Sequence, residues 1–376
     1  MRRGPVCALL LAAAIAVPAH AHTPSDSYLA LRIEDARVAG QWDIALRDLD
    51  FAIGLDSNGD GDITWGELRA RHADIAAYAL ARLKLRSGGA DCPLQAGEHL
   101  VDDHSDGAYD VMRFSATCPG KIDKLDISYS LFADLDPQHR GLLRIEQGAA
   151  TRTAIFGPDR PTQTIDVATI SAWTQFVDYG REGVWHIWIG FDHILFLLSL
   201  LLPAVLTREP LGWRPVQAFK PAFMDVFKIV TSFTVAHSIT LSLATLGVVS
   251  LPSRVAESAI ALSVVLAALN NVFPLVQGRR WVVAFAFGLI HGFGFASVLK
   301  DLGLPQSALL LALVGFNLGV EVGQLAIVSV FLPAAYALRR QWVYRGLVFV
   351  AGSWVIVAVA GTWLIERVFD LKLISR

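Results

Sequence analysis

The second half of this chain is dominated by apolar segments that are each long enough to cross a lipid bilayer. A helix of about 20 apolar residues spans the ~30 Å hydrocarbon core and satisfies its own backbone hydrogen bonds there. The sequence therefore predicts an all-α membrane bundle of about six transmembrane helices, at residues 186–206, 223–248, 255–276, 281–299, 307–337 and 346–368.

The composition supports a membrane protein. Hydrophobic residues make up 54% of the 376 residues, and the mean hydropathy of +0.47 is high for a soluble protein. The formal net charge of −2 offers no basic excess for binding nucleic acid. We therefore expect a lipid bilayer, and no nucleic acid, among the partners of this chain.

The first 21 residues have the pattern of a secretory signal peptide. Arg2 and Arg3 precede a short apolar run, and Ala19-His20-Ala21 has the small-x-small form of a cleavage site. An uncleaved anchor is the alternative, but about a dozen apolar residues is short for a span. We expect a mature chain that begins at His22 on the periplasmic (extracytoplasmic) side of the inner, or plasma, membrane.

The distribution of basic residues predicts the same orientation. The loops after the first, third and fifth predicted spans would face the cytoplasm, whereas the opposite loops contain only Arg254 and Lys300. Cytoplasmic loops are enriched in Lys and Arg. The loops predicted to be cytoplasmic contain Arg208, Arg214, Lys220, Arg279, Arg280, Arg339, Arg340 and Arg345.

Residues 22–165 are predicted to form a small exported α+β domain that resembles a β-sandwich. Apolar and polar residues alternate, as in half-buried strands, at 28–33, 41–46, 110–114 and 125–131. One helix is predicted over residues 64–85. The rest of the chain divides into a linker or interfacial segment at 166–185, the membrane domain at 186–369 and a tail at 370–376.

Two cysteines remain once the signal peptide is removed, because Cys7 lies within it. Exported proteins meet an oxidising environment in which paired cysteines form disulfides. We therefore predict a disulfide between Cys92 and Cys118.

The segment 56–67 matches the twelve-residue loop of an EF-hand at every ligand position. Gly61 stands where the loop turns sharply, and Thr64 stands where a water often bridges to the ion. An acidic turn without an ion is the alternative interpretation. The loop occurs once, which favours a structural Ca²⁺ clip over a sensor, and its predicted ligands are Asp56, Asn58, Asp60, Asp62 and Glu67.

A second acidic stretch, residues 98–106, contains two histidines and three aspartates. Such side chains can bind a metal, but an exposed acidic segment is more often a solvated loop. We interpret this stretch as a loop.

The predicted membrane segments contain a few polar side chains that can bind a metal. His186 and His193 are seven residues apart and would share one helix face. Ionisable residues inside a membrane are costly and indicate functional sites. Imidazole and carboxylate groups suit transition metals. The predicted ligands are His186, Asp192 and His193 near the exported face, with His237, His291 and Glu321 near the middle of the membrane.

Small residues recur every four positions in two predicted spans, at 284, 288, 292 and 296 and at 315, 319 and 323. Such faces allow the backbones of two helices to approach closely. We expect them to pack the bundle tightly.

The motif His186-x5-Asp192-His193, with Gly190 inside it and an apolar run after it, resembles the first-helix signature of the HupE/UreJ family, and its second branch most closely. The family comprises hydrogenase- and urease-accessory membrane proteins. The resemblance implies a transition-metal permease for nickel or cobalt in which His186, Asp192 and His193 bind the metal. The chain departs from the nickel permeases at Ile187, where they have proline, and it retains only His291-Gly292 of their second motif.

Other classes of function are consistent with the same residues. An intramembrane enzyme could use Zn²⁺ to activate water, with Glu321 or Asp192 as the base. A b-type haem protein could use His237 and His291 as axial ligands. The bundle could also serve only to anchor the exported domain. We favour a transporter over an enzyme and assign no catalytic residues.

Overall fold

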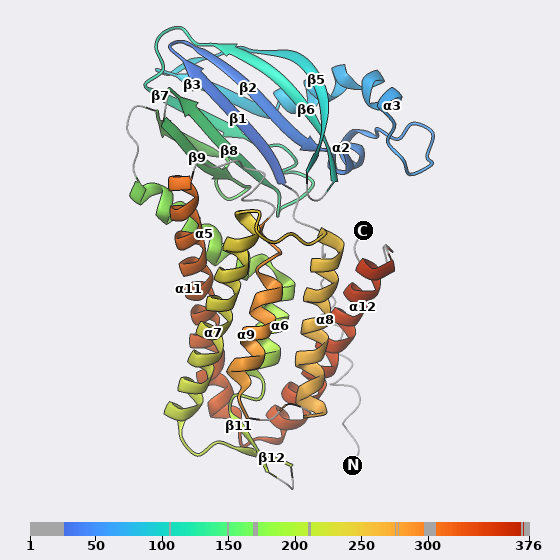
Figure 1. Cartoon of the computed structure of the whole chain (residues 1–376), viewed down its shortest axis with the longest axis vertical. Helices are drawn as coiled ribbons and strands as arrows, with labels where there is room; N and C mark the ends of the chain where they lie inside the picture. The colour runs from blue at the N-terminus through green and yellow to red at the C-terminus, as the bar shows by residue number, and fades with distance from the viewer. Residues whose placement is uncertain are drawn as a thin grey trace, which may run out of the picture.

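The computed structural model of the chain consists of a β-rich domain at one end of a bundle of long helices (Figure 1). The predicted signal peptide, residues 1–21, lies outside the described residues, as does the predicted tail apart from residue 371. The described residues are 26–104, 107–148, 150–167, 172–209, 212–274, 276, 278–296, 306–369 and 371.

The β-rich domain is built from two sheets. The larger sheet has the strand order β5-β6-β2-β1-β8-β9 and the smaller has the order β10-β7-β3-β4. All of its strand pairs are antiparallel except β1 with β8. The strands are β1 (Asp26–Glu34), β2 (Arg37–Ala45), β3 (Leu83–Ser87), β4 (Ala90–Asp91), β5 (Leu94–His104), β6 (Gly107–Thr117), β7 (Lys124–Tyr129), β8 (Arg140–Gln147), β9 (Ala150–Phe156) and β10 (Thr162–Asp166).

The two sheets share one hydrophobic core. Alternate residues of each strand point inward, as in Leu29 and Leu31 of β1 and Leu125 and Ile127 of β7, and all four are buried. The four strands predicted by alternation correspond to β1, β2, β6 and β7, except that Leu46 begins α2 and residues 130–131 follow the end of β7. The β-rich part of the predicted fold is therefore confirmed.

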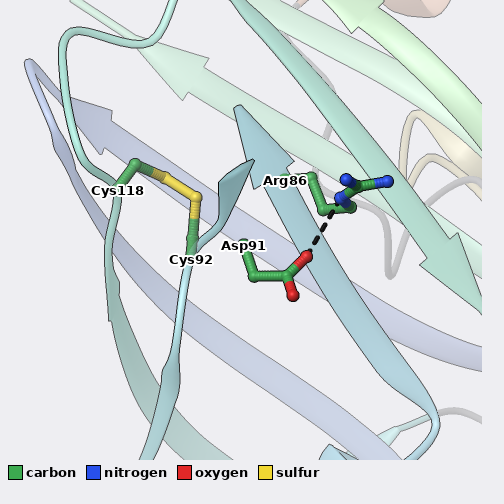
Figure 2. The surroundings of a disulfide bond; sticks show 4 residues. All are labelled: Arg86, Asp91, Cys92 and Cys118. Atoms are coloured by element: carbon green, nitrogen blue, oxygen red, sulfur yellow. Dashed lines mark ion pairs between the residues drawn. A yellow bond between two sulfur atoms is a disulfide. The ribbon is translucent and has the colours of Figure 1, made fainter. Parts of the chain in front are cut away.

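The predicted disulfide is present. Cys92 lies just after β4 and Cys118 just after β6, so the bond links segments that adjoin different sheets (Figure 2). Next to it, the Arg86 and Asp91 side chains form an ion pair of 3.0 Å across the β3–β4 hairpin. The bond closes a loop between positions 26 apart, which corresponds to about 3 kcal/mol in the chain-entropy description.

The helix predicted over residues 64–85 is wrong in its extent. The structure has two shorter helices, α3 (Trp65–Ala70) and α4 (His72–Leu80), and residues 83–87 form β3. Leu83 and Leu85 are buried whereas Lys84 and Arg86 are exposed. This alternation belongs to a strand, and pairing with β7 decides the outcome.

The long helices form the bundle. Four of them are long and apolar enough to cross a membrane, and a fifth such unit is a pair of helices bent by 72°. The helices are α5 (Ala172–Ile189) and α6 (Phe191–Leu201), which form the bent pair, then α7 (Phe219–Thr245), α8 (Ser253–Val272), α9 (Arg280–His291), α11 (Gln306–Leu338), and the π-helical segment η1 (Val343–Ala351), which continues into α12 (Gly352–Phe369).

The described helices differ in detail from the predicted spans. The fourth predicted span, 281–299, contains α9, which has only 12 residues, so the count of six spans stays a prediction. The fifth predicted span, 307–337, corresponds to α11, which continues through Pro333 to Leu338. Flanking apolar residues hold the helix together, and membrane helices tolerate proline where neighbouring groups satisfy the freed carbonyl.

The β-rich domain packs directly on the bundle. Arg160 and Asp178 form an ion pair of 3.2 Å, and Arg140 lies 3.9 Å from Glu182 on α5. The predicted linker, 166–185, therefore includes the first turns of α5. An apolar cluster joins the two parts, with Tyr28, Tyr109 and Leu142 from the domain and Leu241, Ala296 and Phe316 from the bundle.

Candidate metal path in the membrane bundle

Glycines bring the helix backbones of the bundle into contact. A Cβ atom on Gly319 of α11 would lie 1.9 Å from the carbonyl oxygen of Gly180 on α5. Likewise, a Cβ on Gly292 of α9 would lie 2.6 Å from the carbonyl oxygen of His237 on α7. The small residues predicted to pack the bundle therefore do so, and Gly292 draws α9 onto the turn of α7 that carries His237.

The break between α5 and α6 creates the first part of the site. Gly190 lies at the break, and a Cβ there would meet the His186 carbonyl at 2.7 Å and Nδ1 of His193 at 2.9 Å. The sequence predicted one continuous helix face for the two histidines. Instead, the two helices meet at a bend of 72°, and the centroids of the His186 and His193 rings lie 4.5 Å apart across this bend.

The histidine rings then continue into the bundle. The ring centroids of His193 and His291 are 5.2 Å apart. Phe233 of α7 contacts the rings of both His291, at 5.3 Å, and His237, at 6.0 Å. Successive ring contacts thus join four of the six predicted ligands, which are His186, His193, His291 and His237. Asp192 lies next to His193.

Hydrogen bonds assign the proton on three of these rings. Nδ1 of His193 lies 2.9 Å from the carboxylate oxygen Oδ1 of Asp192, which can only accept. The amide Nδ2 of Asn317 donates to the Leu313 carbonyl, so its Oδ1 accepts from Nδ1 of His237 at 3.1 Å. Both histidines therefore carry the proton on Nδ1 and a lone pair on Nε2.

His291 has the opposite tautomer by the same reasoning. The hydroxyl of Ser263 donates to the Ile260 carbonyl at 2.6 Å, so its oxygen accepts from Nε2 of His291 at 2.8 Å. The lone pair of His291 is then on Nδ1. Metal-binding histidines usually donate their other ring nitrogen to such a partner, which fixes the ring for the metal.

The three ring nitrogens that carry a lone pair are buried and have no hydrogen-bond partner among the residues that the structure describes. They are Nε2 of His193, Nε2 of His237 and Nδ1 of His291. The three residues are between 0% and 6% exposed. A buried acceptor without a partner is unfavourable. A metal ion bound to these nitrogens would supply the missing partner.

Glu321 and Gln324 of α11 lie apart from the ring contacts. The Thr231 hydroxyl donates to Glu321 at 2.8 Å, and the Thr234 hydroxyl donates to Gln324 at 3.2 Å. His186, which was expected at the exported surface, is half-buried between Phe295 and Phe316. The structure thus groups His186, Asp192, His193, His237 and His291, and it leaves Glu321 paired with Thr231.

Several contributing residues were missed from the sequence. Ser263 and Thr231 are single hydroxyl residues in apolar helices, and the phenylalanines that enclose the rings look like ordinary core residues. No local signal distinguishes them, because their partners lie 28 or more positions away.

Hydrogen bonds to its own side chains organise the segment predicted to be an EF-hand loop, residues 56–67. It connects α2 (Leu46–Ile53) to α3, and the side chains of Asp56, Asn58 and Asp60 accept hydrogen bonds from backbone amides within the loop. Glu67 reaches back, accepting from Ser57 with one oxygen and from Thr64 with the other. The donor set is all oxygen, which fits Ca²⁺.

These hydrogen bonds act on the acidity of Glu67. The backbone amide of Thr64, then its hydroxyl and then the Ser57 hydroxyl and amide lower the pKa of Glu67 from 4.5 to about 2. The carboxylate is therefore ionised over the whole physiological range, as a calcium ligand must be.

Comparison with known proteins identifies the membrane part of the chain. The family model for HupE / UreJ protein matches residues 162–367, which is more than half of the 376 residues. A comparison with curated proteins finds no match. The matched region begins in β10 and includes every helix that contributes a histidine to the path, so the chain belongs to the HupE/UreJ family.

Proposed function

We propose that this protein is a transition-metal permease, with a nickel- or cobalt-like ion as its substrate. The observation that carries the proposal is the set of three buried histidine nitrogens with lone pairs and no partners. Each belongs to a ring whose other nitrogen is held by Asp192, Asn317 or Ser263. Membership of the HupE/UreJ family supports the same substrate class.

In this proposal the histidines form a path. Among the described residues, the only group of three metal-capable side chains whose ligand atoms lie within 4.8 Å of one another is elsewhere, in the β-rich domain. A permease needs sites that are reachable in turn from the two sides of the membrane. His186, Asp192 and His193 would receive the ion, and His237 and His291 would accept it next. Glu321 would enter as a ligand after release from Thr231.

The arrangement of charge supports an exported β-rich domain. The β11 (Leu206–Glu209) and β12 (Gly212–Pro215) hairpin and the other loops at the end of the bundle away from that domain carry most of its arginines (Figure 1). By the positive-inside rule this end would face the cytoplasm. The EF-hand-like loop would then lie in a compartment supplied with Ca²⁺ and bind that ion as a structural clip.

The test is metal binding and uptake by the purified full chain. We expect the protein to retain Ni²⁺ or Co²⁺ and to carry it into liposomes. The substitution His193→Ala should lower the bound metal at least about tenfold, because it removes a ligand and leaves Asp192 without its partner.

Ser329→Ala provides a control within the bundle. Ser329 is exposed on α11 and donates a hydrogen bond to the Ala326 carbonyl. It should bind and transport metal like the unaltered chain. Equal metal content and uptake in the folded His193→Ala protein would refute the permease.

An intramembrane metal enzyme stays the second candidate, since the same ligands could hold an ion that activates water. It predicts tight metal retention without uptake into liposomes. A haem protein is disfavoured by the packing of α9 on α7. A porphyrin held by His237 and His291 would have to fit between these helices, where a Cβ on Gly288 would already lie 2.5 Å from the Phe233 carbonyl.

A further inference from the structure

The β-rich domain contains a compact group of metal-capable side chains that is separate from both the EF-hand-like loop and the membrane path. It consists of His72, His99 and Asp110, which each offer one ligand atom, and these atoms all lie within 4.8 Å of one another. Among the described residues no other group of three meets this condition.

Three different elements supply the group. His72 is the first residue of α4, His99 lies in β5 and Asp110 lies in β6. The interpretation of residues 98–106 as a solvated loop is wrong as far as His104, because β5 ends only at that residue. The alternation of a strand places His99 and Asp110 on one face.

The pairing of β5 with β6 brings two of the ligands together. His99 pairs with Met112, and a register shift between Ala96 and His99 marks a bulge. Asp110 is the diagonal neighbour of His99 on the same face, because it lies two positions from Met112. Bulges commonly re-aim a side chain, and here Nδ1 of His99 lies 3.0 Å from both oxygens of Asp110.

His72 completes the group from the helical side. Its ring stacks on that of His99 with centroids 4.4 Å apart and planes inclined by 11°. Its Nε2 is buried and has no hydrogen-bond partner within the described part of the chain. The side chains of His99 and Asp110 are 6% and 0% exposed. The Asp110 carboxylate is fully buried, so a positive charge beside it is favourable.

We propose that His72, His99 and Asp110 form a transition-metal site of the Zn²⁺, Co²⁺ or Ni²⁺ class. Ligand atoms around a tetrahedral Zn²⁺ lie about 3.4 Å apart, given metal–nitrogen bonds of about 2.0–2.1 Å. Nδ1 of His99 is hydrogen-bonded to the Asp110 carboxylate at 3.0 Å, and an ion that binds between them would displace the proton of this hydrogen bond. His72 is half-buried at the start of its helix, so its ring can turn to close the remaining distance.

Such a site has three protein ligands and one open position. Structural zinc sites are closed by four protein ligands, whereas an open position accepts water or another donor. The metal would thus be held outside the bundle by ligands that can pass it on. This site does not depend on the membrane path, and it would exist whether or not the bundle transports.

The test uses the purified full chain carrying His193→Ala, which removes a ligand of the membrane path. With Ca²⁺ in excess to occupy the EF-hand-like loop, Zn²⁺ is titrated by calorimetry. We expect about one Zn²⁺ to bind, and His72→Ala to weaken its binding at least about tenfold. His72 makes no hydrogen bond through Nε2, so its removal should leave the domain folded.

His104→Asn is the matched control. His104 also lies in β5 and pairs with a carboxylate, at 3.2 Å from Asp43, but among the described residues it belongs to no group of three metal-capable side chains. It should bind Zn²⁺ as tightly as its parent. Unchanged affinity in His72→Ala, or an equal loss in His104→Asn, would overturn the site.

A second measurement needs no substitution within the group. Cu²⁺ added to the His193→Ala protein should give an electron paramagnetic resonance spectrum with coupling to two imidazole nitrogens. A spectrum without nitrogen coupling would overturn the proposal, and the stacked rings would then be a packing contact alone.

Discussion

At the scale of single residues, the important feature is the hydrogen-bond partner of each candidate ligand. That partner holds the second ring nitrogen of a histidine or the oxygens of a carboxylate. His193, His237 and His291 are held by a carboxylate, an amide and a hydroxyl. The same applies to Glu67, whose two oxygens are held by Ser57 and Thr64. Such partners fix a side chain before an ion arrives, which lowers the entropy lost on binding.

Glu67→Gln should weaken Ca²⁺ binding at least about tenfold, because a bidentate carboxylate becomes a neutral amide. Calcium should raise the melting temperature of the unaltered chain and have much less effect on the variant. Isothermal titration and differential scanning calorimetry measure the two effects. Glu98→Gln, an exposed change on β5, is the control and should leave Ca²⁺ affinity unchanged.

Glu67→Gln should also change how the stability of the chain depends on pH. The pKa of Glu67 is lowered on folding, so its stabilising contribution is fully present above its ordinary pKa of 4.5. That contribution is lost as the pH falls from 4.5 towards 2. Without Ca²⁺, the unaltered chain should therefore lose more stability over this interval than Glu67→Gln, and parallel curves would contradict the assignment.

At the scale of elements, glycine faces decide how closely the helices approach. Gly319 of α11 rests on the backbone of α5 at Gly180, and Gly292 of α9 rests on α7 at His237. Without these contacts the histidines of neighbouring helices would lie farther apart. Helix packing thus determines the metal path as directly as its ligands do.

Gly319→Ala should destabilise the bundle by about 1–3 kcal/mol, the usual range for overpacking, because its Cβ would collide with backbone. Gly361→Ala in α12 is the matched control, since a Cβ there meets nothing within 4 Å. It should be neutral or slightly stabilising. Thermal unfolding in detergent compares the two, and equal melting temperatures would contradict the packing argument.

At the scale of the whole molecule, the β-rich domain stands on one end of the bundle and the arginine-rich loops on the other (Figure 1). The ion pairs of Arg140 and Arg160 with α5 join the domain to the helix that carries His186. In the proposed orientation an ion reaching the β-rich domain is already on the side from which the path begins.

Cysteine labelling tests this orientation in intact cells. Asp134→Cys places a thiol on the exposed surface of the β-rich domain, and Arg340→Cys places one at the far end of the bundle. A membrane-impermeant maleimide should label the first in intact cells and the second only after permeabilisation. The native Cys92 and Cys118 are paired and should not react. The reverse pattern would rule out an exported domain.

The sequence by itself determined the features that depend on local pattern. Runs of apolar residues predicted the bundle and alternation predicted four strands, whereas the calcium ligands at 56–67 stay a prediction. Two cysteines in a domain predicted to be exported indicated their own pairing, and the disulfide is present. Each of these signals lies within a short segment of sequence. The exception is the disulfide, for which two cysteines allow only one pairing.

Only the tertiary structure decided which side chains meet. His291 meets Ser263 across 28 positions and His237 meets Asn317 across 80, and neither spacing has a local signature. The bend at Gly190, the strand at 83–87 and the group of His72, His99 and Asp110 depend likewise on packing between distant segments. Local sequence determines which residues are buried and where the chain turns. Contacts between helices and strands determine which side chains become neighbours, and the proposed chemistry depends on those neighbours.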